Sequence, residues 1–305
     1  MTAKHTRAPL LRLEGISKRF GATQALSNVE FDLRAGEVHA LMGENGAGKS
    51  TLMKILSGIH HKDSGHISVD GQEHTFKSIR DSERCGIHVI HQELNILPDL
   101  SVAENLFLGK ELTYGFGIMK RAEMRRQAHD LLCKLGLDID PKTRAGDLSV
   151  GKQQLVEIAK AIASHAKYIV MDEPTAALTD REIQTLFETV RELKNKGISF
   201  VYISHRMEEV FSQCDDITVM RDGHVIVTCP VKDITVDEVV KAMVGRSIDD
   251  FYPDRTTTPG ESVLEIDNLL PEGNFQPISF NLRKGEILGV AGLMGAGRTE
   301  IMQIG

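Results

Sequence analysis

The first 250 residues contain short apolar segments with the spacing of β-strands. Apolar and polar residues alternate over 11–13 and over 29–33, which predicts strands that bury one face. The runs 38–42 and 168–171 are apolar almost throughout, as expected for strands covered on both faces of a parallel sheet. A further strand is predicted over 198–203.

Helical patterns separate these strands. Ser101 to Glu104 and Thr179 to Glu182 each form a capping box, in which a hydroxyl and a carboxylate three residues apart satisfy free amides at a helix start. Ser149 is placed as the N-cap of a helix that runs to Ala163, and 120–136 carries apolar residues at helical spacing. Alternating strands and helices predict an α/β fold with right-handed crossovers and ligands at the carboxyl ends of its strands.

A glycine-rich segment follows the run 38–42 and opens the next predicted helix. It fits G-x-x-x-x-G-K-[ST] at every defined position, and its residues, with Thr51 after them, are Gly43, Glu44, Asn45, Gly46, Ala47, Gly48, Lys49 and Ser50. Glycine lets backbone N–H groups approach an anion, and the helix start adds a positive dipole end. The segment is predicted to bind the phosphates of a nucleoside triphosphate, with Lys49 on the β and γ oxygens and Ser50 on Mg²⁺.

Polar residues follow three other predicted strands. Asp172 and Glu173 come directly after the strand 168–171, Gln92 comes shortly after a short strand predicted over 87–90, and His205 follows the strand 198–203. Asp172 is predicted to hold Mg²⁺ together with Ser50, and Glu173 to polarise the attacking water. Gln92 and His205 are placed where they can reach the metal and the γ-phosphate.

Phe20 lies between the first two predicted strands, in a segment, 18–21, that the pattern assigns to a loop. An aromatic ring at this place has two interpretations. It stacks on the purine of the nucleotide, or it is an ordinary core residue. The residues alone leave both open.

Composition and charge exclude several classes of protein. A net charge of -7 lacks the basic excess of a nucleic-acid-binding surface. Four cysteines without a C-x-x-C pair indicate neither a disulfide framework nor a zinc site. No segment approaches 18 uninterrupted apolar residues, so any membrane role is expected to depend on a partner protein.

Taken in order, these motifs resemble the nucleotide-binding domain of ATP-binding cassette (ABC) transporters. The matching segments are the phosphate loop, Gln92, Leu148-Ser-Val-Gly-Lys-Gln-Gln154, Asp172-Glu-Pro-Thr175 and Ser204-His205. The resemblance implies ATP and Mg²⁺ as cofactors, with Asp172 as the Walker B aspartate. It implies that Glu173 is the catalytic glutamate and His205 the switch histidine.

The same resemblance assigns the remaining site residues. Phe20 matches the aromatic that stacks on adenine, and Gln92 matches a glutamine that ligates the metal and senses the permease. Ser149 and Gly151 belong to the signature, which in this family faces the phosphate loop of a second domain. The signature usually reads Leu-Ser-Gly-Gly-Gln, so Val150 and Lys152 depart from it and weaken the expectation of two equal ATP sites.

The resemblance also implies the domain organisation. A P-loop NTPase cassette with an antiparallel β subdomain and a helical subdomain is expected, followed by an incomplete second copy. The expected ranges are 10–248 for the first nucleotide-binding domain, about 92–165 for its helical subdomain, 249–262 for a linker and 263–305 for a truncated second domain. The last assignment rests on a repeat, because 277–299 overlays 28–50 without a gap and places Arg298 where Lys49 stands.

Further phrases, such as Asp172-Glu-Pro-Thr-Ala-Ala-Leu-Thr179, are similar to the ATPases of bacterial sugar importers. The implied function is ATP-driven uptake of a monosaccharide, first of all ribose, at the cytoplasmic face of the inner membrane. The alternatives are galactose, xylose, arabinose or autoinducer-2 as cargo, and a soluble tandem ATPase acting on ribosomes or DNA. The implied partners are permease subunits, through them a periplasmic sugar-binding protein, and a second nucleotide-binding domain or another copy, without nucleic acid.

The permease is expected to contact the segment 92–108. Its apolar residues are more numerous than a solvated loop needs, namely Ile96, Leu97, Leu100, Leu106 and Phe107. Packing of these residues inside the helical subdomain explains them equally well.

Overall fold

The computed structural model describes residues 10–114, 117–245, 259–269, 276–292 and 297–303. The chain divides into two compact units, Met1–Ile248 and Asp249–Gly305, and each is described by itself. None of the helices in the described ranges is long and apolar enough to cross a membrane.

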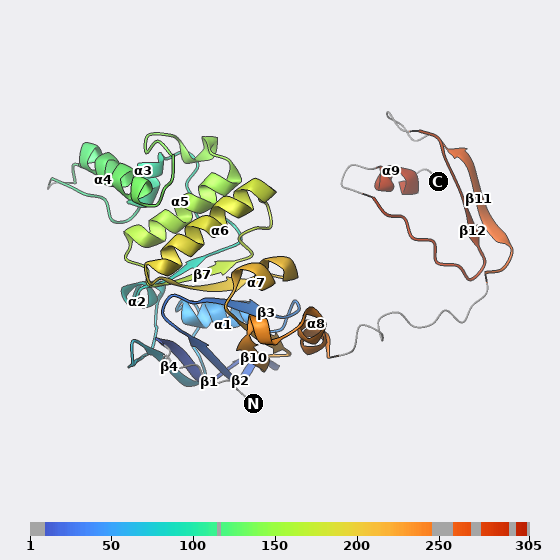
Figure 1. Ribbon diagram of the computed structural model, residues 1–305, viewed down its shortest axis with the longest axis horizontal. Coiled ribbons are helices and arrows are strands. Elements are labelled where there is room, and N and C mark those ends of the chain that lie inside the picture. The colour runs from blue at the N-terminus through green and yellow to red at the C-terminus, as the bar shows by residue number, and fades with distance from the viewer. Residues whose placement is uncertain (1–9, 115–116, 246–258, 270–275, 293–296, 304–305) are drawn as a thin grey trace. The chain divides into compact units, whose positions relative to one another are not determined.

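The first unit is built on a six-stranded sheet with the order β10-β9-β3-β8-β7-β6 (Figure 1). Its strands are β3 (Val38–Met42), β6 (Ile87–Ile90), β7 (Tyr168–Asp172), β8 (Ser199–Ile203), β9 (Asp216–Arg221) and β10 (His224–Pro230). All neighbours pair in parallel except β9 and β10. The carboxyl ends of β3, β6, β7 and β8 therefore lie at one edge of the sheet, which is where the predicted site residues follow.

Both faces of this sheet are buried, which explains the uninterrupted apolar runs. Along β3 and β8, alternate residues enter different cores: Ala40 and Tyr202 pack on one face, and Leu41 and Val201 on the other. The first core is shared with α5 (Val150–Ala163) and α6 (Asp180–Asn195), and the second with α1 (Lys49–Leu56). A strand that contributes to two cores has no position for a solvated side chain.

A second, antiparallel sheet covers α1 from the other side (Figure 1). Its order is β2-β1-β4-β5, with β1 (Leu11–Phe20), β2 (Thr23–Leu33), β4 (Ser64–Val69) and β5 (Gln72–His74). The prediction of a loop over 18–21 is wrong for residues 18–20, because β1 continues to Phe20, which pairs with Thr23 across the tight turn that contains Gly21. The core interpretation of Phe20 is wrong too, since 43% of the residue is exposed.

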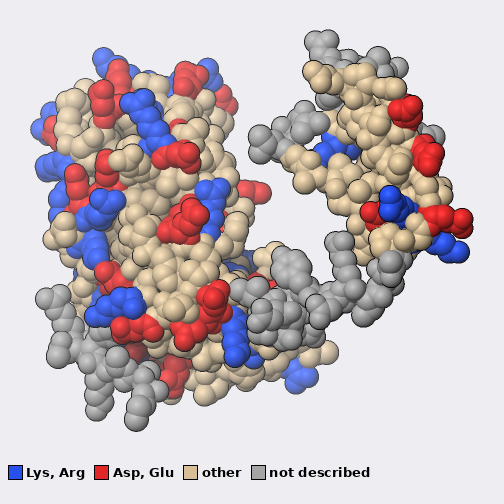
Figure 2. Space-filling model, turned by 45° about the vertical axis from the view of Figure 1, so that its right-hand side comes forward, with Lys and Arg blue, Asp and Glu red and all other residues tan. Residues whose placement is uncertain are grey.

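The remaining helices of this unit are α2 (Ile79–Arg84), α3 (Val102–Leu106), α4 (Arg121–Lys134), α7 (Met207–Gln213) and α8 (Val236–Val244), with 3-10 turns at Ala145–Asp147 and Val231–Asp233. They are short except for α4, and α3 and α4 pack with α5 (Figure 1). The predicted capping boxes are confirmed at Ser101 and Thr179, and Ser149 is confirmed as the N-cap of α5. On the face that Figure 2 shows, Lys and Arg side chains of this unit are interspersed with Asp and Glu.

The second unit contains an antiparallel pair, β11 (Ser262–Leu269) and β12 (Ile278–Arg283), and the helix α9 (Arg298–Gln303). No strand is assigned over 286–292, where Ile287 is 86% exposed. Arg298 begins α9 as Lys49 begins α1. Residues 293–296 of the predicted second phosphate loop, and 249–258 of the predicted linker, lie outside the described residues.

Candidate nucleotide-binding site

The phosphate loop connects β3 to α1, as predicted. Gly43 has φ 154°, and a Cβ there would lie 2.4 Å from the carbonyl oxygen of Met220 on β9. Gly48 has φ 104°, and its Cβ would lie 2.8 Å from the carbonyl oxygen of Ala25 on β2. Glycine is required at both positions because the loop passes close to the backbone of two neighbouring strands.

Lys49 reaches back over this loop. Its Nζ donates hydrogen bonds to the carbonyl oxygens of Gly43, at 2.7 Å, and Glu44, at 3.0 Å. Burial lowers the pKa of Lys49, while the negative charges of Asp172 and Glu173 act in the opposite direction. The half-buried cation thus lies at the start of α1, where the helix dipole also favours an anion.

Asp172 ends β7 next to this cation, and Glu173 directly follows the strand. Burial raises the pKa of Asp172, and the charge of Glu173 raises it further. Glu173 has a left-handed backbone, with φ 47°, and its N–H donates to the carbonyl oxygen of Ile203 at 2.9 Å. Its Oε1 lies 3.2 Å from Nδ1 of His205, whose side chain is 66% exposed. The structure therefore brings Lys49, both carboxylates and His205 to one edge of the sheet.

Asp172→Asn is expected to raise the melting temperature of the ligand-free chain by about 2 °C at pH 7. A carboxylate whose pKa is raised by folding destabilises the folded state above that pKa, and the penalty disappears below its unfolded value of about 3.8. Thermal unfolding at several pH values measures this, and the difference from wild type should shrink as the pH falls toward 4.

The exposed Asp138, changed to Asn, is the matched control and should leave the melting temperature unchanged. A lower melting temperature of Asp172→Asn at pH 7 would contradict the assignment of electrostatic strain to this carboxylate.

Sequence reasoning missed Glu209, a buried residue on α7. Its carboxylate accepts hydrogen bonds from Thr175 Oγ1 at 2.9 Å, from Ser204 Oγ at 3.3 Å and from the Tyr202 hydroxyl. Arg206 Nη1 lies 3.2 Å from its other oxygen. Glu209 thus joins the loop after Asp172-Glu173 to the segment that carries His205, and no motif points to it.

The structure gives the positions of other predicted site residues. Ser50 is exposed and Thr51 is half-buried in the first turn of α1, and Gln92 is exposed two residues after β6. Phe20 lies at the end of β1 against the ring of His60. Their roles stay predictions.

The signature residues are tied to the start of α6. The N–H of Gly151 donates to Glu182 Oε1 at 3.2 Å, and a Cβ at Gly151 would lie 2.6 Å from the same side chain. The amide of Thr179 and the hydroxyl of Ser149 are the largest causes that lower the pKa of Glu182 to about 2. Glu182 therefore serves the predicted capping box and also fixes the signature, which sequence patterns did not indicate.

The segment 92–108 divides between the two interpretations left open above. Leu106 is buried, and Ile96 and Phe107 pack against the main core, so core packing accounts for these three. Leu97 and Leu108 are 46% and 38% exposed. An apolar surface remains at these two residues.

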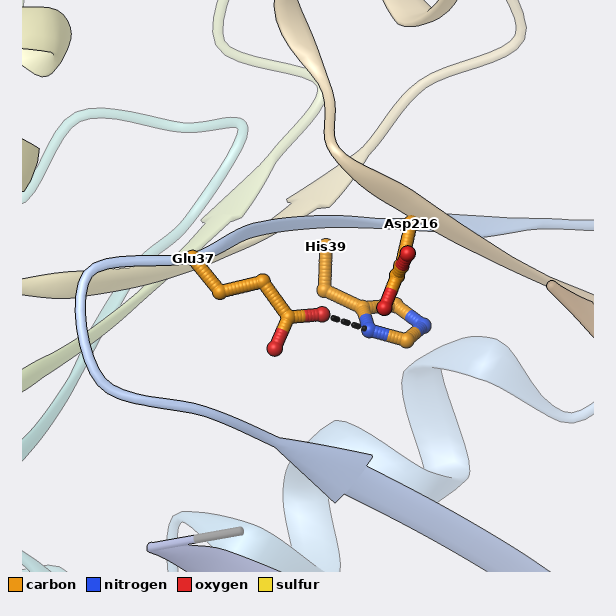
Figure 3. A group of neighbouring side chains, drawn as sticks. All are labelled: Glu37, His39 and Asp216. Carbon is orange, nitrogen blue, oxygen red and sulfur yellow. Dashed lines mark hydrogen bonds and ion pairs between the residues drawn. The ribbon is translucent and has the colours of Figure 1, made fainter. Parts of the chain in front are cut away.

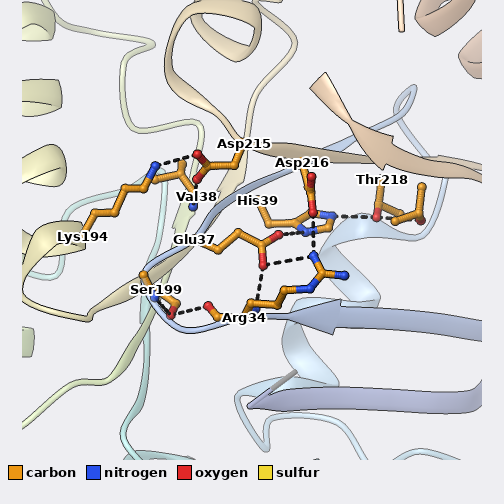
Figure 4. A network of polar contacts seen from close by, with 11 residues as sticks. Arg34, Glu37, Val38, His39, Lys194, Ser199, Asp215, Asp216 and Thr218 are labelled. Carbon is orange, nitrogen blue, oxygen red and sulfur yellow. Dashed lines mark hydrogen bonds and ion pairs between the residues drawn. The ribbon is translucent and has the colours of Figure 1, made fainter. Parts of the chain in front are cut away.

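A separate buried cluster joins β3 to its neighbours. Glu37, His39 and Asp216 bring three possible metal ligands within 4.8 Å of one another (Figure 3). Arg34 Nη1 donates to Asp216 Oδ2 at 2.6 Å and lies 3.6 Å from Glu37 Oε2 (Figure 4). His39 contacts Glu37 through Nδ1 and Thr218 through Nε2, both at 2.7 Å. Because the guanidinium already supplies a cation between the carboxylates, we assign this cluster to the fold and not to a metal.

Residues 26–176 match the family model described as ABC transporter. The structure of a nucleotide-free ATP-binding cassette from an ABC transporter is 33% identical, with a TM-score of 0.70, and covers 78% of this chain and all of the other. The chain belongs to the ATP-binding cassette family. The expected family and the α/β P-loop fold are thereby confirmed. The ADP conformation of the cassette MJ1267 aligns equally well, with 33% identity over 79% of this chain and all of that one, and a TM-score of 0.70.

Curated relatives match nearly the whole chain. The ribose import ATP-binding protein RbsA of Halalkalibacterium halodurans is 56% identical over 96% of this chain, and that of Bacillus subtilis is 52% identical over 96%. In both comparisons the chain spans 59% of the relative's length.

Proposed function

We propose that this cassette is the ATP-hydrolysing part of a bacterial sugar importer and that its cargo is ribose. The observation that carries the proposal is that Asp172, Glu173 and His205 lie at the carboxyl edge of the sheet close to Lys49, which directly precedes Ser50 in a complete phosphate loop. The identity of 52–56% to ribose import proteins over 96% of the chain supports the choice of ribose.

The residues fit Mg²⁺ together with the nucleotide. Two adjacent carboxylates lie at the end of β7, and the raised pKa of Asp172 reflects burial and their mutual repulsion, which a divalent cation would relieve. Asp172, the Ser50 hydroxyl and Gln92 would hold the ion. Mg²⁺, when bound, neutralises charge on the β and γ phosphate oxygens.

The chain's own groups then perform the hydrolysis. Lys49 leaves the carbonyl oxygens of its loop for the β and γ phosphates, which replaces two neutral acceptors by an anion. Glu173 orients the attacking water, and His205, 3.2 Å away, holds Glu173 and contacts the γ-phosphate. Catalysis is thus mostly positioning and charge neutralisation.

The proposed partners follow from the function. Permease subunits would dock on the surface near Leu97 and Leu108, at the cytoplasmic face of the inner membrane, and a periplasmic binding protein would select the sugar. A second nucleotide-binding domain, or another copy, would place its phosphate loop opposite Ser149 and Gly151. Action on ribosomes or DNA is the rival, and neither the net charge of -7 nor the interspersed charges on the face that Figure 2 shows support it.

A chimera tests the proposal. Residues 10–292 of this chain replace the matching part of the Bacillus subtilis relative in cells that lack their own copy, and uptake of labelled ribose is measured. We expect uptake well above that of the Lys49→Ala chimera. A chimera that hydrolyses ATP but moves no ribose would overturn the sugar assignment and retain the ATPase.

A further inference from the structure

The exposed ring of Phe20 is held in place by the segment that follows α1. His60 lies against it with ring centroids 5.2 Å apart and planes at 66°, which is the favourable edge-to-face arrangement. Lys18 Nζ lies 5.4 Å from the centroid of the Phe20 ring. Two side chains therefore fix the orientation of an aromatic ring that is 43% exposed.

Asp63 holds the backbone that carries this ring. Its carboxylate accepts hydrogen bonds from Lys18 Nζ and from the N–H of Arg19, both at 2.7 Å. The N–H of Asp63 donates to the carbonyl oxygen of Ser17 at 2.9 Å. Residues 60–63 thus contact the end of β1 at three successive residues and at the Phe20 ring itself.

The same segment is fixed to the helix that begins in the phosphate loop. The N–H groups of Ile59 and His60 both donate to the carbonyl oxygen of Lys54 at 2.9 Å. Helix α1 starts at Lys49, and Lys54 lies five residues further on, so about 7.5 Å of helix separates the end of the phosphate loop from the carbonyl group that holds this segment. One element therefore sets both ends of the proposed nucleotide site.

We propose that His60 and Asp63 form a clamp that positions Phe20 for stacking on the purine base. The proposal rests on the proposed function, because it assumes that the Phe20 ring stacks on the base of the nucleotide. It deepens that function by naming the residues that orient this ring. A ring that only filled the core would be covered, whereas Phe20 is held by an aromatic contact with His60 and by the Lys18 cation over its ring, and it stays exposed. The clamp contributes to the affinity for the base and not to the affinity for the phosphates.

The test compares ATP with inorganic tripolyphosphate, which carries phosphates without a base. Calorimetric titration of the full chain with each probe gives both dissociation constants. Base stacking on an aromatic side chain predicts that Phe20→Ala weakens ATP binding about 5-fold to 150-fold. The loss of one aromatic pair predicts that His60→Ala weakens it about threefold to tenfold, without changing tripolyphosphate binding.

The chain offers a rescue and a matched control. His60→Phe keeps an aromatic edge against Phe20 and should restore the affinity for ATP. His61→Ala removes the neighbouring imidazole, whose Nδ1 lies 3.3 Å from the carbonyl oxygen of Phe76 instead, and should bind both probes as wild type does. Asp63→Asn, which weakens the contacts with Lys18 and Arg19, should lower ATP affinity alone.

Each contrary result has a separate meaning. If His60→Ala weakens ATP and tripolyphosphate equally, His60 supports α1 as a whole and the clamp is overturned. If Phe20→Ala binds ATP as tightly as wild type, Phe20 does not stack on the base, and the clamp is overturned as well. If wild type binds neither probe, the proposed function itself fails.

Discussion

Glu173→Gln should lower the turnover of ATP by about 10²-fold to 10⁴-fold and leave the affinity for Mg-ATP nearly unchanged. Gln keeps the size of the side chain, but it cannot polarise the attacking water as a carboxylate does. Lys49→Ala should instead lose the affinity for ATP, because it removes the cation that the phosphate loop holds for the β and γ phosphates. Nucleotide titration and ATPase assays on the chimera described above separate the two effects.

Two further variants check this assignment of roles. His205→Ala should keep ATP binding and lose hydrolysis, because His205 holds Glu173 at 3.2 Å, and near-normal turnover would remove it from the site. Glu188→Gln changes an exposed glutamate on α6 and should have no effect. Equal losses of ATP affinity in Lys49→Ala and Glu173→Gln would contradict the separate roles.

Glu209→Ala is expected to destabilise the first unit by about 3–5 kcal/mol and to lower its melting temperature by about 10 °C. The buried hydroxyls of Thr175, Tyr202 and Ser204 would each lose their acceptor, and Arg206 would lose its counter-charge. Hydrolysis should also fall in the chimera, because the segments that carry Glu173 and His205 would no longer be tied together. Thermal unfolding and ATPase assays measure the two effects.

The neighbouring Glu208 provides the control, since it is exposed in the same helix turn. Glu208→Ala should shift the melting temperature by no more than about 2 °C, the contribution of a carboxylate to a helix dipole. A wild-type melting temperature for Glu209→Ala would show that the network of hydroxyls is satisfied without its central acceptor.

The sequence by itself determined those features whose causes lie within a few residues. The phosphate loop needs glycines, a lysine and a hydroxyl at fixed spacing, and the capping boxes at Ser101 and Thr179 need a hydroxyl and a carboxylate three residues apart. The strands of the central sheet are apolar at successive residues because a core covers each face of the sheet. Each of these follows from local hydrogen bonding or from burial, which the order of residues records directly.

Only the tertiary structure decided features that depend on residues far apart in the chain. The pattern around Phe20 predicts a loop, but pairing with β2 makes the residue the end of β1. Its ring contacts His60, 40 residues later in the chain, and no local pattern indicates that contact. Glu209 acquires its role because the fold brings Thr175 and Ser204 within hydrogen-bond distance of its carboxylate, and Glu182 because α6 begins beside Gly151. A short-range pattern contains no information on such contacts, because the packing of separate elements, and not the propensity of either one, brings their side chains together.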